Sequence, residues 1–384
     1  MGSITRSFAN LITANGPSAV ADGSVTTADI SGNINFRNII INGDMSIAQR
    51  GTSATGLTGG AYNTADRFYL NMGTAGTWTN TISTDVPTGQ GFAKSFKLDC
   101  TTANASLSAG SYMTVQQRFE GQNLQYIKKG TSSAESLTLS FWVKSNKTGT
   151  YIALLKDNDN GRDISKSYTI SSADTWEKKT ITFPGDTSGA LDNDDGASLM
   201  VYFWLVAGST YQSGSLQTSW NSTDDSAVGQ VNLADSTDNE WYITGVQLEA
   251  GTSASDFEFL PHDVNLKRCE RYFQYYHEIR MYVSLARIGD TSGIWTPSFY
   301  YRNKFRTTPT KVYYDTDGYS GNSNRMRVMR LDSSNTTTTN INGGFYEDTN
   351  TDFAINSYNT STGIAGYGDS AILTFYDLEA DAEL

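Results

Sequence analysis

Cysteine and histidine are scarce in this sequence, and their scarcity excludes several kinds of site. The two cysteines, Cys100 and Cys269, lie far apart in unlike contexts, so neither a disulfide framework nor a zinc site has support. We expect both to be buried thiols. The two histidines, His262 and His277, exclude a metal site with several histidine ligands and leave a Ser-His-Asp triad only these two bases. We expect them to lie at a surface or an interface rather than to act in catalysis.

Charge is also scarce and mostly of one sign. Charged residues make up 18% of the chain, against about 25% in typical soluble domains, and the formal net charge is −12. Phosphate binding needs clustered lysine and arginine, so this acidic balance argues against nucleic acid and against an anionic membrane surface. No apolar run approaches the roughly 20 residues that a membrane helix needs, and residues 1–6 lack the apolar core of a secretion signal. We expect a protein that is made in a cytosol and does not insert into a membrane.

Glycine and aromatic residues are abundant instead, with 35 Gly, 22 Tyr and 17 Phe but only 6 Pro in 384 residues. Aromatic and β-branched side chains build cores on pleated surfaces. Residues 137–144 alternate apolar and polar side chains, which is the pattern of a half-buried strand. Residues 199–206 are apolar on both faces and predict a strand that is central or lines a groove. Polar turns separate such runs without a sustained helical period, so the pattern predicts an antiparallel β-sandwich or barrel.

The pattern changes at three points along the chain. Residues 1–36 carry too little apolar surface to fold alone and are interpreted as an attachment segment or a flexible tail. Residues 37–260 contain the strands of the sandwich. Residues 261–280 predict a linker helix with Asp263 as its N-cap. Residues 281–384 return to strand-like runs and predict a second, smaller β-domain whose loop tips are suited to binding.

The apolar stripe of the predicted linker helix consists of Leu266, Cys269, Phe273 and Tyr276. Loops of the second domain are expected at residues 337–340 and 361–363.

Five separate segments carry a resemblance to a known family. They are residues 42–45, 48–51, 66–68, 140–144 and 246–249, which read NGDM, AQRG, DRF, SFWVK and VQLE. In this order and spacing they resemble the fibre and tail-fibre proteins of tailed bacteriophages, over roughly residues 37–280. That family couples a carbohydrate-binding-module-like β-sandwich to further β structure. The resemblance implies a jelly-roll topology for the sandwich and a linker helix near the axis of a trimer.

Three outward aromatic side chains are candidates for sugar binding, which normally stacks aromatic faces on pyranose rings. Trp142 projects opposite the apolar row of residues 137–143, and Tyr202 and Trp204 project from the strand at residues 199–206. If the two strands lie in one sheet, the three side chains form a platform on its outer surface. The alternatives are that they cover a subunit interface or lie in a second core layer.

Acidic residues gather at two turns around Gly161 and Gly196. Hard oxygen ligands on turns suit Ca²⁺, although neither turn fits the EF-hand loop. The alternative is that these residues are solvated turn residues. We expect no cofactor other than this structural calcium. The candidate ligands are Asp157, Asp159, Asp192 and Asp194.

Catalysis has little support in the sequence. Glycoside hydrolysis needs two closely spaced carboxylates, but a chain with 40 acidic residues offers no signal by abundance alone. The long stack of a parallel β-helix, which usually houses depolymerase chemistry in phage fibres, has no counterpart in an internal repeat. We therefore expect no enzymatic activity.

The combined interpretation is a phage virion component, a homotrimeric tail fibre made in the host cytoplasm. Its N-terminal segment is expected to attach to adaptor or nozzle proteins of the tail, and its β-domains to contact host cell-surface polysaccharide during adsorption. The alternatives are a head-attached or spacer fibre with a purely structural role and a capsule-degrading tailspike. A free secreted lectin or glycanase is disfavoured by the missing export signal and the shortage of histidine.

Overall fold

The computed structural model describes residues 37–222, 226–288, 291–295, 299–314, 325–331, 338–342, 353–355, 358–359 and 370–384. The expected attachment segment at residues 1–36 and the expected loop at residues 361–363 lie outside the described residues. Among the described residues, no helix is both long and apolar enough to cross a bilayer.

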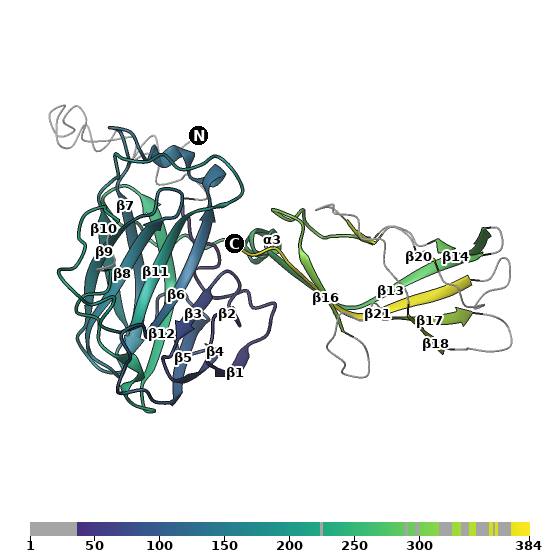
Figure 1. Ribbon diagram of the computed structural model, residues 1–384, viewed down its shortest axis with the longest axis horizontal. Helices are drawn as coiled ribbons and strands as arrows, with labels where there is room; N and C mark the ends of the chain where they lie inside the picture. Colours follow the sequence, from purple (N-terminus) through teal and green to yellow (C-terminus); the bar gives the residue numbers. More distant parts are fainter. Residues whose placement is uncertain are drawn as a thin grey trace, which may run out of the picture.

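Within the described residues, the first part of the chain builds two antiparallel sheets of six strands each, which pack face to face (Figure 1). Sheet 1 contains, in spatial order, β1 (Ser53–Leu57), β4 (Thr77–Ser83), β5 (Ser95–Thr102), β12 (Glu240–Ala250), β7 (Leu137–Ser145) and β10 (Glu177–Phe183). Sheet 2 contains β2 (Ala61–Tyr62), β3 (Tyr69–Gly73), β6 (Tyr112–Glu120), β11 (Ala197–Ala207), β8 (Gly149–Asp157) and β9 (Arg162–Ile170). Short 3₁₀ turns lie at η2 (Gly121–Asn123), η3 (Gln125–Ile127) and η4 (Leu233–Asp235).

The strands from β5 to β12 pair in a nested order. β5 pairs with β12, β6 with β11, β7 with β10 and β8 with β9, and every pair is antiparallel. The first and third pairs belong to sheet 1, and the second and fourth belong to sheet 2. This nesting across two sheets is the jelly roll. The expected antiparallel β-sandwich is therefore confirmed, and the strand pairing itself defines its topology.

Alternation along the strands builds the core between the two sheets. Leu139, Phe141 and Val143 of β7 are fully buried, as the period-2 pattern predicts. Val201 and Phe203 of β11 are fully buried from the opposite side. The rings of Phe141 and Phe203 meet edge to face with their centroids 5.0 Å apart, a geometry that adds about 0.5–1.5 kcal/mol beyond the burial of area.

Both cysteines are buried free thiols, as expected. Burial raises the pKa of Cys100 to about 11 and raises the pKa of Cys269 well above its usual value. Both thiols are therefore protonated at neutral pH and are poor nucleophiles.

The predicted helix is correct in its start and wrong in its end. Helix α3 spans His262–Glu270, so Asp263 lies in its first turn rather than at the N-cap, which is Pro261. The chain then enters strand β13 (Phe273–Ile288). The second half of the predicted apolar stripe therefore belongs to a strand. Aromatic residues favour strands, and pairing of β13 with β21 (Ser370–Asp381) overrides the helical spacing.

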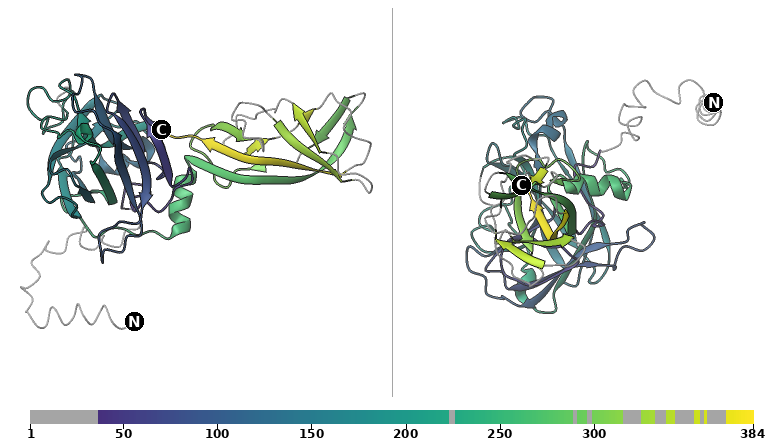
Figure 2. Two further views of the ribbon diagram at one scale, coloured as in Figure 1. Left: turned by 90° about the horizontal axis from the view of Figure 1, so that it is seen from below. Right: turned by 90° about the vertical axis from the view of Figure 1, so that its right-hand side faces the viewer.

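The C-terminal part of the chain forms a second β unit, which extends away from the sandwich beyond α3 (Figures 1 and 2). The expected loop at residues 337–340 is wrong in large part, because strand β18 begins at Thr338. The main sheet contains, in spatial order, β18 (Thr338–Asn342), β17 (Arg325–Leu331), β21, β13, β14 (Thr291–Trp295) and β20 (Tyr358–Asn359), with β16 (Thr310–Tyr314) also paired to β21. A two-stranded sheet pairs β15 (Phe299–Tyr300) with β19 (Phe353–Ile355).

Arginine side chains of the sandwich bind the end of β21, which returns to the junction (Figure 1). Arg67 is fully buried, pairs with the carboxylate of Glu383, and lies 3.4 Å from the centroid of the Tyr272 ring. Its φ of +73° is in the left-handed region, which is uncommon for a residue other than glycine. Arg50 pairs with Asp381 at 2.8 Å. The sandwich and the returning chain are thus joined by ion pairs, of which Arg67–Glu383 has little contact with water and Arg50–Asp381 is partly exposed.

Four of the five segments that carry the family resemblance meet beside this arginine cluster, and the fifth, residues 140–144, lies on β7. Asn42 donates from its side-chain amide to the carbonyl of Asp66 at 3.1 Å, and Gln49 donates to the Asp66 carboxylate from its backbone at 2.9 Å and its side chain at 2.6 Å. Gly43 accepts from the backbone of Val246 at 2.9 Å, and a Cβ at this glycine would lie 2.1 Å from the Val246 carbonyl oxygen. These residues therefore shape the junction of the sandwich rather than a ligand site.

We predict that Glu383→Gln destabilises the protein by about 3–5 kcal/mol, because it leaves the Arg67 charge buried without its carboxylate. Urea denaturation of the full chain measures the change. Glu135→Gln is the matched control, since its partnership with Lys128 is exposed and should contribute no more than about 1 kcal/mol. Equal losses of stability in the two variants would show that the buried ion pair contributes no more than the exposed one.

Candidate carbohydrate-binding surface

The predicted platform of three aromatic side chains is wrong. Trp142 lies on β7 in sheet 1, whereas Tyr202 and Trp204 lie on β11 in sheet 2. The outer faces of the two sheets point away from each other, so one ligand cannot contact all three rings. Alternation predicts which face of its own strand a side chain occupies, but it does not predict which sheet the strand joins.

Trp204 belongs to a second core layer on the outer side of sheet 2, which was one of the alternatives. Its side chain is 5% exposed and packs in a small apolar cluster with Ile152 and Leu154. Its ring centroid lies 5.1 Å from that of Tyr211, on the segment that follows β11. Tyr202 packs against the same cluster. The central position expected for this strand is confirmed, since β11 pairs with β6 on one side and β8 on the other.

Trp142 does project from the outer face of sheet 1, and it is half-buried there. Its neighbours across the sheet are Thr244 on β12 and Lys178 on β10. Other aromatic and charged side chains share this side of the sheet. We call the set the aromatic face. It consists of Trp142, Trp176 and Tyr242 together with Lys97, Lys144, Asp85 and Glu240.

The aromatic face is held together by ring and cation contacts. The rings of Trp176 and Tyr242 meet edge to face at 6.1 Å between centroids. The ammonium of Lys144 lies 4.3 Å from the centroid of Tyr242 and pairs with Asp85. The indole N–H of Trp176 donates to Asp85 at 2.9 Å, which fixes the plane of its ring. Trp176 is thus positioned by a contact at its edge while its ring remains half-buried.

Ion pairs set the charge of the aromatic face. Lys97 and Glu240 approach to 2.7 Å. Although partial burial raises the pKa of Asp85, hydrogen bonds from Lys144 and Trp176 outweigh it and lower that pKa below its usual value. Asp85 is therefore ionised beside the Lys144 ammonium at neutral pH. The face combines aromatic rings with balanced hydrogen-bond donors and acceptors.

Trp176 and Tyr242 were not identified from the sequence. Tyr242 alternates with the fully buried Trp241, so the strand pattern indicates that it points outward. Nothing in the pattern places β12 beside β7, because residues 146–239, with four other strands, lie between the end of β7 at Ser145 and the start of β12 at Glu240. The grouping is a product of the jelly-roll nesting.

The four predicted calcium ligands do not converge. Asp157 is fully buried and forms an ion pair with Lys129, whose ammonium also donates to the carbonyl of Gly189 at 2.9 Å. Asp159 accepts from the backbone N–H of Asp192 at 2.9 Å. The carboxylate of Asp194 accepts from the backbone N–H of Gly196 at 2.9 Å. Among the residues that the structure describes, no group of three or more His, Cys, Asp or Glu side chains is arranged to hold a metal ion.

Both histidines are exposed. His262 begins α3 and His277 lies on β13. Both histidines therefore lie at the surface, as expected.

Comparison with known proteins gives only distant likenesses. No protein-family model matches the sequence, and no curated protein matches it. Among solved structures, the tailspike protein 4 enzymatically active domain of bacteriophage CBA120 is 15% identical with a TM-score of 0.29, and the match covers 56% of this chain and 21% of that one. A putative sugar binding protein from Bacteroides thetaiotaomicron is 13% identical with a TM-score of 0.30, covering 56% and 99%.

The family 11 carbohydrate-binding module from Clostridium thermocellum is 13% identical with a TM-score of 0.27, covering 53% of this chain and 99% of that one. The match spans about a fifth of the tailspike domain. The fold assignment rests on the strand pairing described above, not on these likenesses.

We predict that Trp204→Ala destabilises the protein by about 3–5 kcal/mol, because it removes a buried ring from the second core layer. Trp142→Ala should have a clearly smaller effect, because its half-buried ring leaves no enclosed cavity. Thermal and urea unfolding of the two variants measure the difference. A Trp204→Ala variant as stable as the parent would place that ring outside the packed layer.

Proposed function

We propose that this chain is a fibre subunit of a phage virion that binds host-surface glycan through the aromatic face of sheet 1. The single observation that carries the binding proposal is the pair of half-buried indole rings, Trp142 and Trp176, set among ordered charged groups. Such rings offer apolar faces to the C–H side of a sugar, while carboxylate and ammonium groups bond its hydroxyls.

The charge of the aromatic face favours an uncharged sugar. Lys97 is paired with Glu240, and Lys144 is paired with Asp85, so neither sign is in excess at these pairs. An acidic sugar would meet two carboxylates at once, and like charges in close contact are unfavourable. We propose a neutral glycan as the ligand of this face, bound without chemical change.

The fibre part of the proposal is supported by where the family-like segments lie. Four of the five build the junction at which the sandwich carries an elongated second β unit (Figure 2). A rigid junction suits a protein that projects a binding domain from a particle. In this proposal residues 1–36 attach the fibre to adaptor or nozzle proteins of the phage tail, and three copies assemble around one axis.

We predict that Trp142→Ala and Trp176→Ala each weaken binding of the purified protein to host cells or to a neutral-glycan array by about tenfold or more. The magnitude is set by analogy with nucleic-acid bases, for which stacking on an aromatic side chain contributes about 1–3 kcal/mol. Unfolding temperatures should change little. Phe259→Ala is the control, because Phe259 is 51% exposed and lies outside the aromatic face. Unchanged binding in both tryptophan variants would refute the proposed surface.

The assembly is tested separately. We predict that light scattering coupled to size-exclusion chromatography gives three times the mass of one chain for the full-length protein. Trp142→Ala should leave this mass unchanged, because the half-buried ring is assigned to the ligand and not to the subunit interface. A monomer at micromolar concentration would contradict the trimer. Dissociation of the Trp142→Ala variant would show that the Trp142 ring belongs to the subunit interface.

A further inference from the structure

The dipeptide Asn-Gly, which is open to a spontaneous chemical change, occurs four times in the chain. Two of the pairs, Asn42-Gly43 and Asn160-Gly161, lie wholly within the described residues. The pair at 15–16 and the second residue of the pair at 342–343 lie outside them. The same chemistry can therefore be compared in two known surroundings of one protein.

The change is deamidation. The backbone nitrogen of the residue after an asparagine attacks the carbonyl carbon of the asparagine side chain and forms a cyclic imide. The bond to the amide nitrogen breaks, and the displaced nitrogen leaves as ammonia with the proton of the backbone N–H. Water then opens the imide to aspartate or isoaspartate. Glycine favours the attack, because it has no Cβ to obstruct it and its backbone is less restricted.

The surroundings of Asn42-Gly43 oppose this reaction. Asn42 is 2% exposed, and its side-chain amide donates to the carbonyl of Ile47 at 2.8 Å while its side-chain oxygen accepts from the Ile47 N–H at 2.9 Å. The backbone of Gly43 is packed against that of Val246, since a Cβ there would lie 2.1 Å from the Val246 carbonyl oxygen. Neither reacting group can move unless the buried junction opens.

The surroundings of Asn160-Gly161 leave room for it. Both residues are exposed in the turn between β8 and β9. Gly161 has a φ of +62°, and a Cβ added to it would meet no atom within 4 Å. The backbone nitrogen of Gly161 therefore lies on an open part of the turn, where a change of the backbone angles displaces no packed neighbour.

The side-chain amide of Asn160 also has a structural role. It donates to both carboxylate oxygens of Asp157, at 3.2 and 2.9 Å, and to the carbonyl of Ala190 at 2.9 Å. It thereby joins the turn between β8 and β9 to the segment around Ala190. These bonds are at most partly buried, and surface turns open locally at a much lower free energy than the whole fold.

Deamidation would reverse the polarity of this contact. A carboxylate at position 160 has no N–H to donate to Asp157 or Ala190. It would also place a second negative charge beside Asp157, and like charges in close contact repel. Lys129 and Arg162 do not offset this charge freely, because Lys129 already pairs with Asp157 and Asp186, and Arg162 pairs with Asp186 at 2.8 Å.

We propose that Asn160-Gly161 is a site of spontaneous deamidation in the folded protein, and that the new carboxylate releases the turn between β8 and β9 from the segment around Ala190. Asn42-Gly43, with the same two residue types, stays unmodified as long as the junction is folded. This inference does not depend on the fibre or glycan proposals, because Asn160 lies outside the aromatic face.

The reaction is tested on the full-length protein, incubated at mildly alkaline pH in native buffer and, in parallel, in guanidinium chloride. Peptide mapping by mass spectrometry follows each asparagine. In native buffer Asn160 should deamidate at least about tenfold faster than Asn42, because Asn42 reacts only after buried structure opens. In denaturant the two should react at similar rates, which is the internal control. Equal rates in native buffer, or an Asn160 that reacts only in denaturant, would overturn the proposal.

The structural consequence is tested with Asn160→Asp, which carries the carboxylate of the product. Hydrogen exchange of the backbone amides in residues 157–162 should become severalfold faster than in the parent. Asn158→Asp is the matched control, since it adds the same charge to an exposed position of the same turn, and the Asn158 side chain donates none of these bonds. Equal exchange in the two variants would refute the release of the turn. If Asn160→Asp does not fold, the parent protein before and after deamidation gives the same comparison.

Discussion

The buried guanidinium of Arg67 is the constraint on which the arrangement of the two β units depends. A charge that is fully removed from water must be paired, and the carboxylate of Glu383 comes from the far end of the chain. Arg67 also adopts a left-handed φ, which surrounding structure must impose. The hydrogen bonds of Asn42, Asp66 and Gln49 supply that structure. Strand β21 is therefore bound to the sandwich at the same junction from which β13 leaves.

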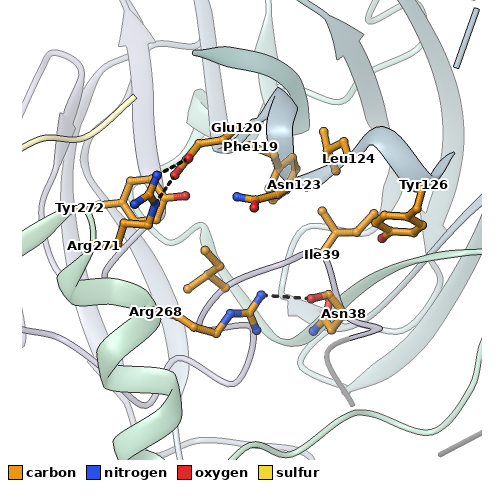
Figure 3. A pocket seen from close by; sticks show the side chains of 11 residues that line it. Asn38, Ile39, Phe119, Glu120, Asn123, Leu124, Tyr126, Arg268, Arg271 and Tyr272 are labelled. Carbon is orange, nitrogen blue, oxygen red and sulfur yellow. Dashed lines mark hydrogen bonds and ion pairs between the residues drawn. The ribbon is translucent and has the colours of Figure 1, made fainter. Parts of the chain in front are cut away.

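The residues of this junction join the two β units, and they are not the residues assigned to ligand binding. The segments that give the chain its family resemblance mostly contact one another, the core or the returning chain, apart from Trp142 and Lys144 on the aromatic face. The candidate binding surface, the aromatic face on sheet 1, lies apart from the junction, and a pocket lies between β6 and α3 (Figure 3). The ion pairs of the aromatic face are balanced, and the pocket wall holds the ion pair of Arg271 with Glu120. The junction can therefore support the second β unit while the aromatic face stays available to a ligand.

The strand faces were predictable from sequence, and the partners of those strands were not. Phe141 and Val143 turn inward and Trp142 turns outward, as alternation requires. The prediction failed where it joined Trp142 to Trp204, because it assumed that their strands shared a sheet. It also failed where apolar spacing continued the helix past Glu270, since the same residues pair as a strand with β21. The acidic turns were found, but Lys129 as the partner of Asp157 was not.

The sequence by itself determined the class of the fold, the inward rows of each strand, the burial of both thiols and the start of α3, because these depend on side-chain polarity and on neighbours within a few residues. Only the tertiary structure decided the nesting of the strands, which side chains lie beside Trp142 on the outer face of sheet 1, the burial of Trp204 and the pairing of Arg67 with Glu383. These features join residues tens to hundreds of positions apart. Their energies depend on which strands pair, and no local pattern contains that information.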